Sequence, residues 1–555
     1  MYASVPDYRT ISDTDDNPAY ALALASGMPV YFPAGQGLSA DGAYLIDTPA
    51  GTSNVTSGLQ LIGDGIGRSI IRRTSVPGVV NFFYDSGSAD PDDNLVNLLI
   101  RDLTIEDDPE RELGFAEHVD LVHVNGVSDS IFQRVEFKGF RGDGLYLGAG
   151  LSIAHERHNR RIIVRDCIFD GVDNQNRNGI SVLDMDDLSI EDCAFRNCTK
   201  LDGSMPGPIN LEPDVSNGAT PPDLYLFRII RNVRIVNNSF QNCGGNAFSL
   251  LLPSLDLANQ VENIIIERNR VGDCRGALFF SGYGGTDAVS SVKKWGVQFI
   301  ANHVRDCTLP HYILLDGAFG LLMERNTFED CGFVQLGYWA KSRHMRIENN
   351  NFIRCGGGTA AAFVVDRSLI DVWIEDNHFL ECAYFILLIR GANANFSRFR
   401  FNRNRIEGAA TVAVLMQVGP LGTWTGSADG ECQAVGNMVA ESIWGINNVS
   451  FNGPSLSYSN GWVSYGGDHA PVVRKDDSDI VTVTGAVKNG TATAGTIMFT
   501  LPVGYRPAAT YRTATSSVGS VARIQVNRDG TVATESGVAS GDCHLNLAFA
   551  GRPGT

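Results

Sequence analysis

The sequence lacks both a basic leader and an apolar run that could span a membrane. Asp7, Asp13, Asp15 and Asp16 precede the first apolar stretch, which is the opposite of the basic start of a secretory signal peptide. The longest apolar run, Ala383–Ile389, is far shorter than the ~20 residues that a membrane-spanning helix needs. We therefore expect a chain that is made in a cytosol and is not inserted into a membrane.

Basic charge is also scarce. The 44 Lys and Arg residues face 62 Asp and Glu residues, which gives a formal net charge of −18. Such a surface repels nucleic acid and anionic lipid, so no nucleic-acid partner is expected. Only 19% of the residues are charged and 43% are apolar, which excludes a disordered chain and predicts a large core.

Paired cysteines are absent too. The chain has 11 cysteines, and none lies in the C-x-x-C pairing that is typical of zinc sites. The sequence therefore predicts no metal site and no cofactor.

The sequence is rich in glycine, with 60 residues, and contains a repeat between Leu98 and about Gln417. An apolar anchor residue recurs at intervals of 24 to 45 residues, and each anchor has an apolar residue five positions earlier. Apolar positions two apart, between tight polar turns, indicate short strands with one buried face. This pattern predicts an all-β chain, a parallel β-helix of about eleven coils. The anchors are Ile105, Phe137, Phe169, Phe195, Phe240, Val271, Val304, Phe328, Phe352, Phe379 and Ile406.

Two polar columns accompany the anchors. Asn stands two positions before the anchor in seven successive coils, from Asn238 to Asn404, and Cys stands three positions after it in seven coils, from Cys198 to Cys382. We expect the Asn residues to adopt the left-handed conformation at a bend between two strands. We expect the Cys residues to be small buried apolar groups, stacked from coil to coil.

The two ends of the chain differ from the repeat. Thr14–Ser26 predicts a short capping helix, with Asp16 or Asn17 as N-cap and Pro18 in the first turn. From about Pro454 the repeat is gone, and alternating strands with hairpin signals at Asn489-Gly490 and Asp529-Gly530 predict an antiparallel β domain. The predicted organisation is a cap with the first strands (1–97), the β-helix (98–453) and a C-terminal domain (454–555), for which the resemblance described next implies trimerisation or receptor and glycan binding.

Two stretches carry a resemblance to known families. TDDNPAYALALASGMPVYFPAG, followed by LIGDGIGRSII, resembles the entry to pectate-lyase-like right-handed parallel β-helices, especially bacteriophage tailspikes. GTIMFTLPVGYRPA resembles C-terminal modules of phage tail fibres. The resemblance implies a homotrimeric virion spike, made in the host cytoplasm and assembled with other phage tail proteins. It also implies a depolymerase that binds and degrades a bacterial surface polysaccharide, which is a capsule, an exopolysaccharide or an O-antigen.

A second strand in each coil carries an apolar-x-apolar pair, and the residue that follows the pair is expected to face outward. That column reads Gly148, Leu183, Glu212, Leu251, Ser281, Asp316, Gly337, Asp366 and Leu388. Glu212 and Asp316 are then three coils apart, and Asp316 and Asp366 are two coils apart. Glycoside hydrolysis needs one protonated and one ionised carboxyl group, so we predict an endo-acting glycoside hydrolase with Glu212, Asp316 and Asp366 as catalytic residues.

Aromatic and polar residues near this column are candidates for sugar binding, because aromatic rings and charged forks suit carbohydrate. The predicted substrate-binding residues are Asp214, Tyr283, Tyr338, Trp339, Lys341, Arg367 and Arg390.

Two alternatives stay open at this point. A polysaccharide lyase, acting by β-elimination on a uronic-acid polymer, needs a base and cations, for which Tyr338, His344, Lys341, Arg367 and Arg390 are available. A non-catalytic adhesin would bind a glycan without cleaving it. The site lies within one subunit or between subunits, and the sequence does not decide which.

Overall fold

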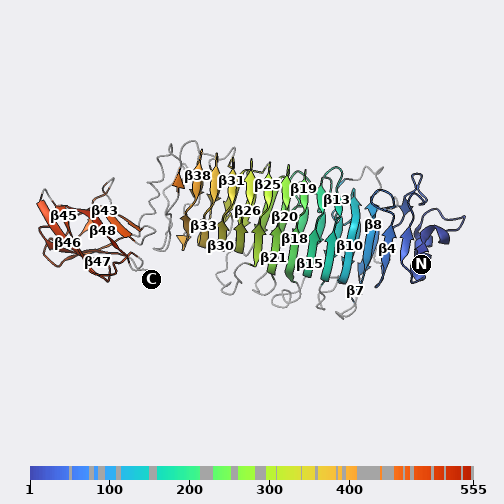
Figure 1. Cartoon of the computed structure of the whole chain (residues 1–555), viewed down its shortest axis with the longest axis horizontal. Helices are drawn as coiled ribbons and strands as arrows, with labels where there is room; N and C mark the ends of the chain where they lie inside the picture. Colours follow the sequence, from blue (N-terminus) through green and yellow to red (C-terminus); the bar gives the residue numbers. More distant parts are fainter. Residues whose placement is uncertain are drawn as a thin grey trace.

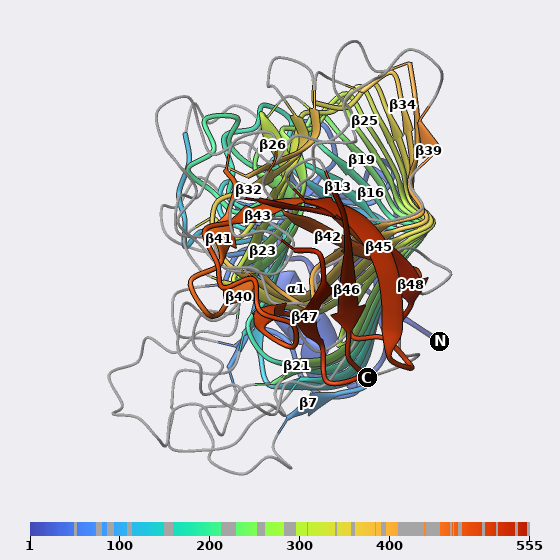
Figure 2. The same ribbon diagram turned by 90° about the vertical axis from the view of Figure 1, so that its left-hand side faces the viewer.

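The computed structural model describes residues 1–48, 53–73, 80–85, 94–107, 114–148, 159–212, 229–251, 261–281, 296–307, 309–338, 341–356, 361–382, 385–389, 396–408, 438–439, 456–466, 469, 471–475, 480–501, 505–517, 520–538 and 542–551. Parallel strands stack coil upon coil into a rod, which Figure 1 shows from its blue N-terminal end to its orange end. The predicted parallel β-helix is confirmed. Each coil contributes strands to three faces, here called A, B and C, and Figure 2 looks along the stack.

Face A consists of the longer strands and, through the bent strands β8 (Leu99–Glu106) and β10 (Val127–Lys138), continues into face B as one 28-stranded sheet. Its other strands are β1 (Ala3–Ser4), β2 (Val30–Phe32), β4 (Gln60–Gly63), β7 (Leu95–Val96), β12 (Arg160–Arg165), β15 (Met185–Glu191), β18 (Ile230–Val236), β21 (Val261–Glu267), β24 (Val297–Ile300), β27 (Phe319–Glu324), β30 (Ser342–Glu348), β33 (Leu369–Glu375), β36 (Phe396–Ser397) and β37 (Arg400–Asn402).

Face B consists mostly of three-residue strands that carry the anchors at their centres. They are β3 (Tyr44–Leu45), β5 (Ile70–Arg72), β13 (Ile168–Asp170), β16 (Ala194–Arg196), β19 (Ser239–Gln241), β22 (Arg270–Gly272), β25 (His303–Arg305), β28 (Thr327–Glu329), β31 (Asn351–Ile353), β34 (His378–Leu380), β38 (Arg405–Glu407) and β39 (Met438–Val439). Because β3 and β5 precede the first anchor and β39 follows the last, the rod has more coils than the predicted eleven.

Face C is a separate 11-stranded parallel sheet. Its strands are β6 (Phe82–Asp85), β9 (Val122–Asn125), β11 (Leu145–Gly148), β14 (Ile180–Val182), β17 (Ile209–Leu211), β20 (Asn246–Leu251), β23 (Gly276–Ser281), β26 (His311–Asp316), β29 (Phe333–Leu336), β32 (Ala361–Val365) and β35 (Phe385–Ile389).

The anchors form the centre of the core, as the repeat predicted. From Phe137 to Ile406 they pair coil by coil in one register, and all eleven anchors are at most 2% exposed. The rings of Phe137, Phe169 and Phe195 stack almost parallel, 4.6 and 4.7 Å apart. A single hydrophobic core therefore runs through the rod from Ala3 to Ile406.

The Asn column is a ladder of buried side-chain amides. Asn326, for example, donates from its side chain to Oδ1 of Asn350 at 2.9 Å and to the carbonyl of Phe299 at 2.8 Å, and its Oδ1 accepts from the backbone N–H of Asn302 at 2.8 Å. The expectation that these Asn residues are left-handed is wrong. The left-handed residue is instead the one before each Asn, for example Arg325 with φ 55°. The Asn column is therefore explained by its hydrogen bonds between coils.

The Cys column is buried and carries no disulfide, as predicted. The Cys355 thiol donates to the carbonyl of the anchor Phe328 in the preceding coil, and Cys382 does the same to Phe352. Burial raises the pKa of the Cys243 thiol well above its ordinary value, so this thiol stays protonated and is a weak nucleophile.

The N-terminal end of the rod has the predicted helix, α1 (Asn17–Ala25), next to the 3-10 turn η1 (Val5–Tyr8). Asp16 stands at the N-cap, but its side chain makes no capping hydrogen bond. It is fully buried and instead binds Arg9 and accepts from the backbone N–H groups of Leu38 and Leu45. Asp16 therefore ties the helix to the first coils.

The C-terminal strands are antiparallel, as predicted, and form two sheets around a second core. The Asp529-Gly530 turn joins two paired strands, whereas Asn489-Gly490 joins strands of different sheets and is no hairpin. The predicted boundary at 453/454 lies outside the described residues. One sheet contains β40 (Ser457–Tyr458), β44 (Ile497–Thr500), β47 (Thr531–Ser536), β46 (Ser520–Val526) and β45 (Tyr511–Ser517), and the other contains β41 (Val463–Ser464), β43 (Ile480–Lys488), β42 (Val472–Lys475) and β48 (Cys543–Ala550).

Candidate functional site

Face C carries the predicted carboxylates in the predicted register. The apolar pairs of β11 to β32 align strand by strand, which places Glu212, Asp316 and Asp366 in one column at the ends of β17, β26 and β32. Leu388 was wrongly assigned to this column: Leu387 pairs with Phe363, and Ile389 with Val365, so β35 is displaced by two residues.

The Glu212 side chain is 37% exposed. Its Oε2 accepts a hydrogen bond from the Asn210 side chain at 2.8 Å and lies 3.5 Å from Nη2 of Arg177. The Arg177 side chain is only 16% exposed and forms a second ion pair, on the side away from Glu212. Glu212 is therefore fixed by two partners while one side of it faces solvent.

The second ion-pair partner of Arg177 is Asp143, whose side chain is fully buried. Nη1 of Arg177 lies 3.1 Å from Oδ2 of Asp143, and the Asp143 backbone N–H donates to Asp120 at 2.7 Å. Burial, together with the nearby Asp120 charge, raises the pKa of Asp143 to about 7, against the lowering effect of Arg177 and Ser181. Because one planar guanidinium bridges Asp143 and Glu212, their carboxylates lie within about 9 Å of each other.

An aromatic pair lies on the same part of face C. The His123 ring stacks on Tyr146 with centroids 4.2 Å apart, and Nδ1 of His123 lies 2.8 Å from Oδ2 of Asp120. His123, Tyr146, Ser181 and Asn210 are successive strand partners, so they form one outward row across β9, β11, β14 and β17. Arg177 Nη1 lies 3.4 Å from the Ser181 hydroxyl, which joins this row to the carboxylate cluster.

Sequence analysis missed Asp120, His123, Asp143, Tyr146 and Arg177. The prediction of the outward column considered only the residue after each apolar-x-apolar pair. It did not consider the residue between the two apolar positions, which also faces away from the core. In VHV, LYL, ISV and INL that middle residue is His123, Tyr146, Ser181 and Asn210, so the middle position was the available signal. The burial of Asp143 follows only from the fold.

Asp316 and Asp366 lie farther along face C and are separated from each other by the β29 coil. Asp316 is 5% exposed, and Asp366 is half-buried and accepts a hydrogen bond from the Gln335 side chain at 3.2 Å. Glu212 is three coils from Asp316, a distance of about 14 Å along the rod, so the three carboxylates share a face but do not form one cluster.

The predicted binding residues have mixed outcomes. Tyr338 is 36% exposed and its ring stacks with His311, the first residue of β26, at 6.4 Å. Arg367 is exposed next to Asp366, and Lys341 stands just before β30, where the chain has left face C. Asp214, Tyr283, Trp339 and Arg390 lie outside the described residues.

His344 does not belong to face C. It lies in β30 on face A, and its Nδ1 is 2.9 Å from Oδ2 of Asp371. His344 is therefore removed from the residues that the lyase alternative assigned to this site. In the described part of the chain, no group of three or more His, Cys, Asp or Glu side chains is arranged to hold a metal ion. Within the same residues, no helix is long and apolar enough to cross a membrane.

Comparison with known proteins gives the handedness of the rod. A family model described as "Right handed beta helix region" matches residues 260–416. The N-terminal fragment of gene product 12 of bacteriophage phi29 is 13% identical and has a TM-score of 0.54, covering 79% of this chain and 70% of that chain. The chain is a right-handed parallel β-helix protein.

Two further solved structures are similar over much of this right-handed β-helix chain. The tailspike protein of Escherichia coli bacteriophage HK620, in complex with a hexasaccharide, is 12% identical, covering 99% of this chain and 93% of that chain with a TM-score of 0.46. The A-module of a mannuronan C-5 epimerase from Azotobacter vinelandii is 15% identical, covering 80% and 100% with a TM-score of 0.45. No curated protein matches the chain. At these identities the likeness concerns the fold.

Proposed function

We propose that the chain is a bacteriophage spike protein that binds a bacterial surface polysaccharide along face C and cleaves it by endo-glycosidic hydrolysis. The observation that carries the proposal is the column of carboxylates on face C, with Glu212 at one end and Asp316 and Asp366 at the other. The phage context comes from the tailspike-like motifs of the sequence. Assembly as a homotrimer with other tail proteins belongs to the same proposal.

Hydrolysis assigns two roles to these carboxylates. A protonated carboxyl group donates its proton to the glycosidic oxygen, so that the bond to the anomeric carbon breaks, while an ionised carboxylate removes a proton from the attacking water. Asp316 and Asp366, two coils or about 10 Å apart at the backbone, come close to the 6.5–9.5 Å of inverting enzymes when the side chains converge. Glu212 or Asp366 is the proposed acid.

The cluster around Glu212 supports a binding and positioning role for its neighbours. Arg177 and Asn210 fix the Glu212 carboxylate, and the stacked His123 and Tyr146 rings offer an aromatic surface in the same row of side chains. Asp143 has a pKa suited to an acid, but its side chain is fully buried. We therefore assign Asp143 to positioning Arg177.

A second candidate function, a polysaccharide lyase, is favoured by one specific group of residues. β-Elimination needs a base near a cation that neutralises the uronate carboxylate. His123, Tyr146 and Arg177 supply these groups within one part of face C.

Digestion of a panel of capsular and O-antigen polysaccharides tests both functions. Chain length is followed by size exclusion, and unsaturated ends are followed by ultraviolet absorbance. Shortening without absorbance is the result that the hydrolase proposal predicts. Shortening with rising absorbance overturns hydrolysis in favour of the lyase, and binding without shortening leaves the non-catalytic adhesin.

A further inference from the structure

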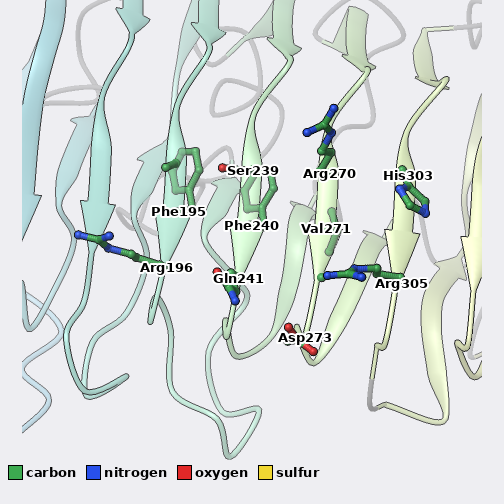
Figure 3. Close-up of a pocket in the computed structure, with 12 residues that line it drawn as sticks. Phe195, Arg196, Ser239, Phe240, Gln241, Arg270, Val271, Asp273, His303 and Arg305 are labelled. Atoms are coloured by element: carbon green, nitrogen blue, oxygen red, sulfur yellow. The ribbon is translucent and has the colours of Figure 1, made fainter.

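A depression on face B has no role in the chemistry proposed for face C. It has a volume of about 540 Å³ and lies across the outward positions of four successive strands, β16, β19, β22 and β25. Its polar lining is mostly basic, as Figure 3 shows: Arg196, Arg270, His303 and Arg305 surround Ser239 and Gln241, and Asp273 is the acidic member. On a chain with a net charge of −18, such a concentration of cations needs an explanation.

The strand register places the two central cations in adjacent coils. Arg270 pairs with His303, and Gly272, two residues along β22, pairs with Arg305. A Cβ atom at Gly272 would lie 3.4 Å from Nε of Arg305, so the arginine side chain lies against β22 beside this glycine. In Figure 3 the Arg305 side chain extends along the floor of the depression toward the neighbouring coil.

These two arginines differ from the other arginines of face B in their ion pairs. Nε of Arg196 lies 2.8 Å from Asp170, and Nε of Arg405, in the same column as Arg270, lies 2.6 Å from Glu407. The only carboxylate within 4.0 Å of Arg305 among the described residues is that of Asp306, at 3.9 Å. Arg270 donates its backbone N–H to the carbonyl of Asn238, and among the same residues its side chain makes no hydrogen bond or ion pair. Two weakly compensated cations one coil apart repel each other unless an anion lies between them.

We propose that this depression binds the carboxylate groups of an acidic polysaccharide chain. Arg270 and Arg305 would each donate a fork of charge-assisted hydrogen bonds to a carboxylate, and Ser239 and Gln241 would bond the sugar hydroxyls. The depression runs across successive coils, so it suits a chain that lies along the rod. The rest of the strongly acidic surface disfavours a long polyanion such as nucleic acid, which needs many phosphate contacts.

The inference rests on the proposed polysaccharide-binding function for the class of ligand, but not on cleavage at face C. It adds that the glycan is acidic and that it is held at a second place on the rod. A chain held on face B stays attached to the protein when the segment on face C is released.

Affinity electrophoresis tests the proposal on the full-length chain. Gels contain polygalacturonate, alginate, hyaluronan or, as the neutral control polymer, dextran. The proteins are the wild type, the double variant Arg270→Ala/Arg305→Ala and the matched variant Arg405→Ala, which removes an ion-paired arginine from the same column. Circular dichroism verifies that all three are folded, which exposed arginine substitutions allow.

We expect at least one acidic polymer to retard the wild type and Arg405→Ala equally, with no retardation by dextran. The double variant should bind at least about tenfold more weakly, because two charge-assisted contacts are lost. Equal retardation of the double variant, or no retardation of the wild type by any of the three acidic polymers, overturns the proposal. If the panel digestion fails while this pattern is found, the face B site stands and the proposed cleavage does not.

Discussion

The two halves of the rod share one apolar core and differ in the outward row of face C and at one buried corner. On face C the outward row begins with Phe83 on β6 and is then polar from β9 to β20, with His123, Tyr146, Ser181, Asn210 and Ser249. In the C-terminal half the same row is mainly apolar, with Phe279, Leu314, Val364 and Leu388 and only Gln335 among them. The strand register is continuous from β6 to β35, so the fold does not require this change.

The corner between faces A and B differs between the halves as well. The Asn ladder runs from Asn238 to Asn404, whereas Cys167 and Cys193 take the equivalent positions in earlier coils. The C-terminal half is thus stabilised by a chain of buried amides, and the N-terminal half carries the denser, largely buried polar cluster on the outward side of face C. The comparison teaches that inward positions carry the fold and outward positions carry the chemistry.

Breaking the Asn ladder should have the largest effect on stability. Asn326→Ala removes the acceptor for two N–H groups of Asn302 and the donor to Phe299, all in the buried interior. We expect a loss of about 4 kcal/mol, since buried polar groups are left without partners. Urea unfolding measures it, with Asn351→Ala, an exposed Asn in the next coil, as the control that should change stability by less than about 0.5 kcal/mol.

Removing Arg177, which lies in the N-terminal half of the rod, should have the next largest effect on stability. Arg177→Met leaves the buried Asp143 carboxylate without its cation, which we expect to cost about 3 kcal/mol at pH 8. Denaturant unfolding at pH 8 and pH 5 checks this, because protonation of Asp143 at pH 5 relieves part of the loss. The exposed Arg367→Met serves as control. An equal loss at both pH values would contradict the assigned role of the Asp143 charge.

The pH dependence of stability should depend on Asp143. Its folded pKa of about 7 lies above its ordinary value, so the folded state keeps a proton that the unfolded state has lost between about pH 4 and pH 7. This group therefore stabilises the fold fully below pH 4, and that contribution is lost as the pH rises through 7. Relative to the wild type, Asp143→Asn should gain about 4 kcal/mol between pH 4 and pH 8, because each unit of pKa difference corresponds to about 1.4 kcal/mol. Thermal unfolding across this range measures the gain, and parallel pH profiles would refute it.

The smallest effect should come from the corner position that has Cys in place of Asn. Cys193→Ala removes a small buried group whose thiol bonds only backbone carbonyls, so we expect a loss of about 1 kcal/mol. Urea unfolding of Cys193→Ala and Asn326→Ala under the same conditions compares the two losses of stability. If the two variants lose equal stability, the two halves do not differ in the way described.

The sequence predicted the interior of the rod well and its exterior poorly, for a physical reason. An anchor such as Phe169 must be apolar in every coil because it stacks on the coils beside it, so the repeat reveals it. Outward residues such as His123 and Tyr146 are free to differ from coil to coil, so no period marks them. Asp143 and Arg177 are brought together by the fold across coils, 34 residues apart. The register of Glu212, Asp316 and Asp366 was predictable, but the partners that fix Glu212 were not.

The most direct test of the account is the initial rate of polysaccharide shortening by Glu212→Gln, on whichever polymer the wild type cleaves. The matched control is Glu267→Gln on face A, a partly exposed Glu that also has an arginine partner. The account predicts a rate lower by about 100-fold or more for Glu212→Gln, with an unchanged melting temperature and wild-type activity of the control. A Glu212→Gln rate within about twofold of the wild type would contradict the assignment of the chemistry to this column of face C.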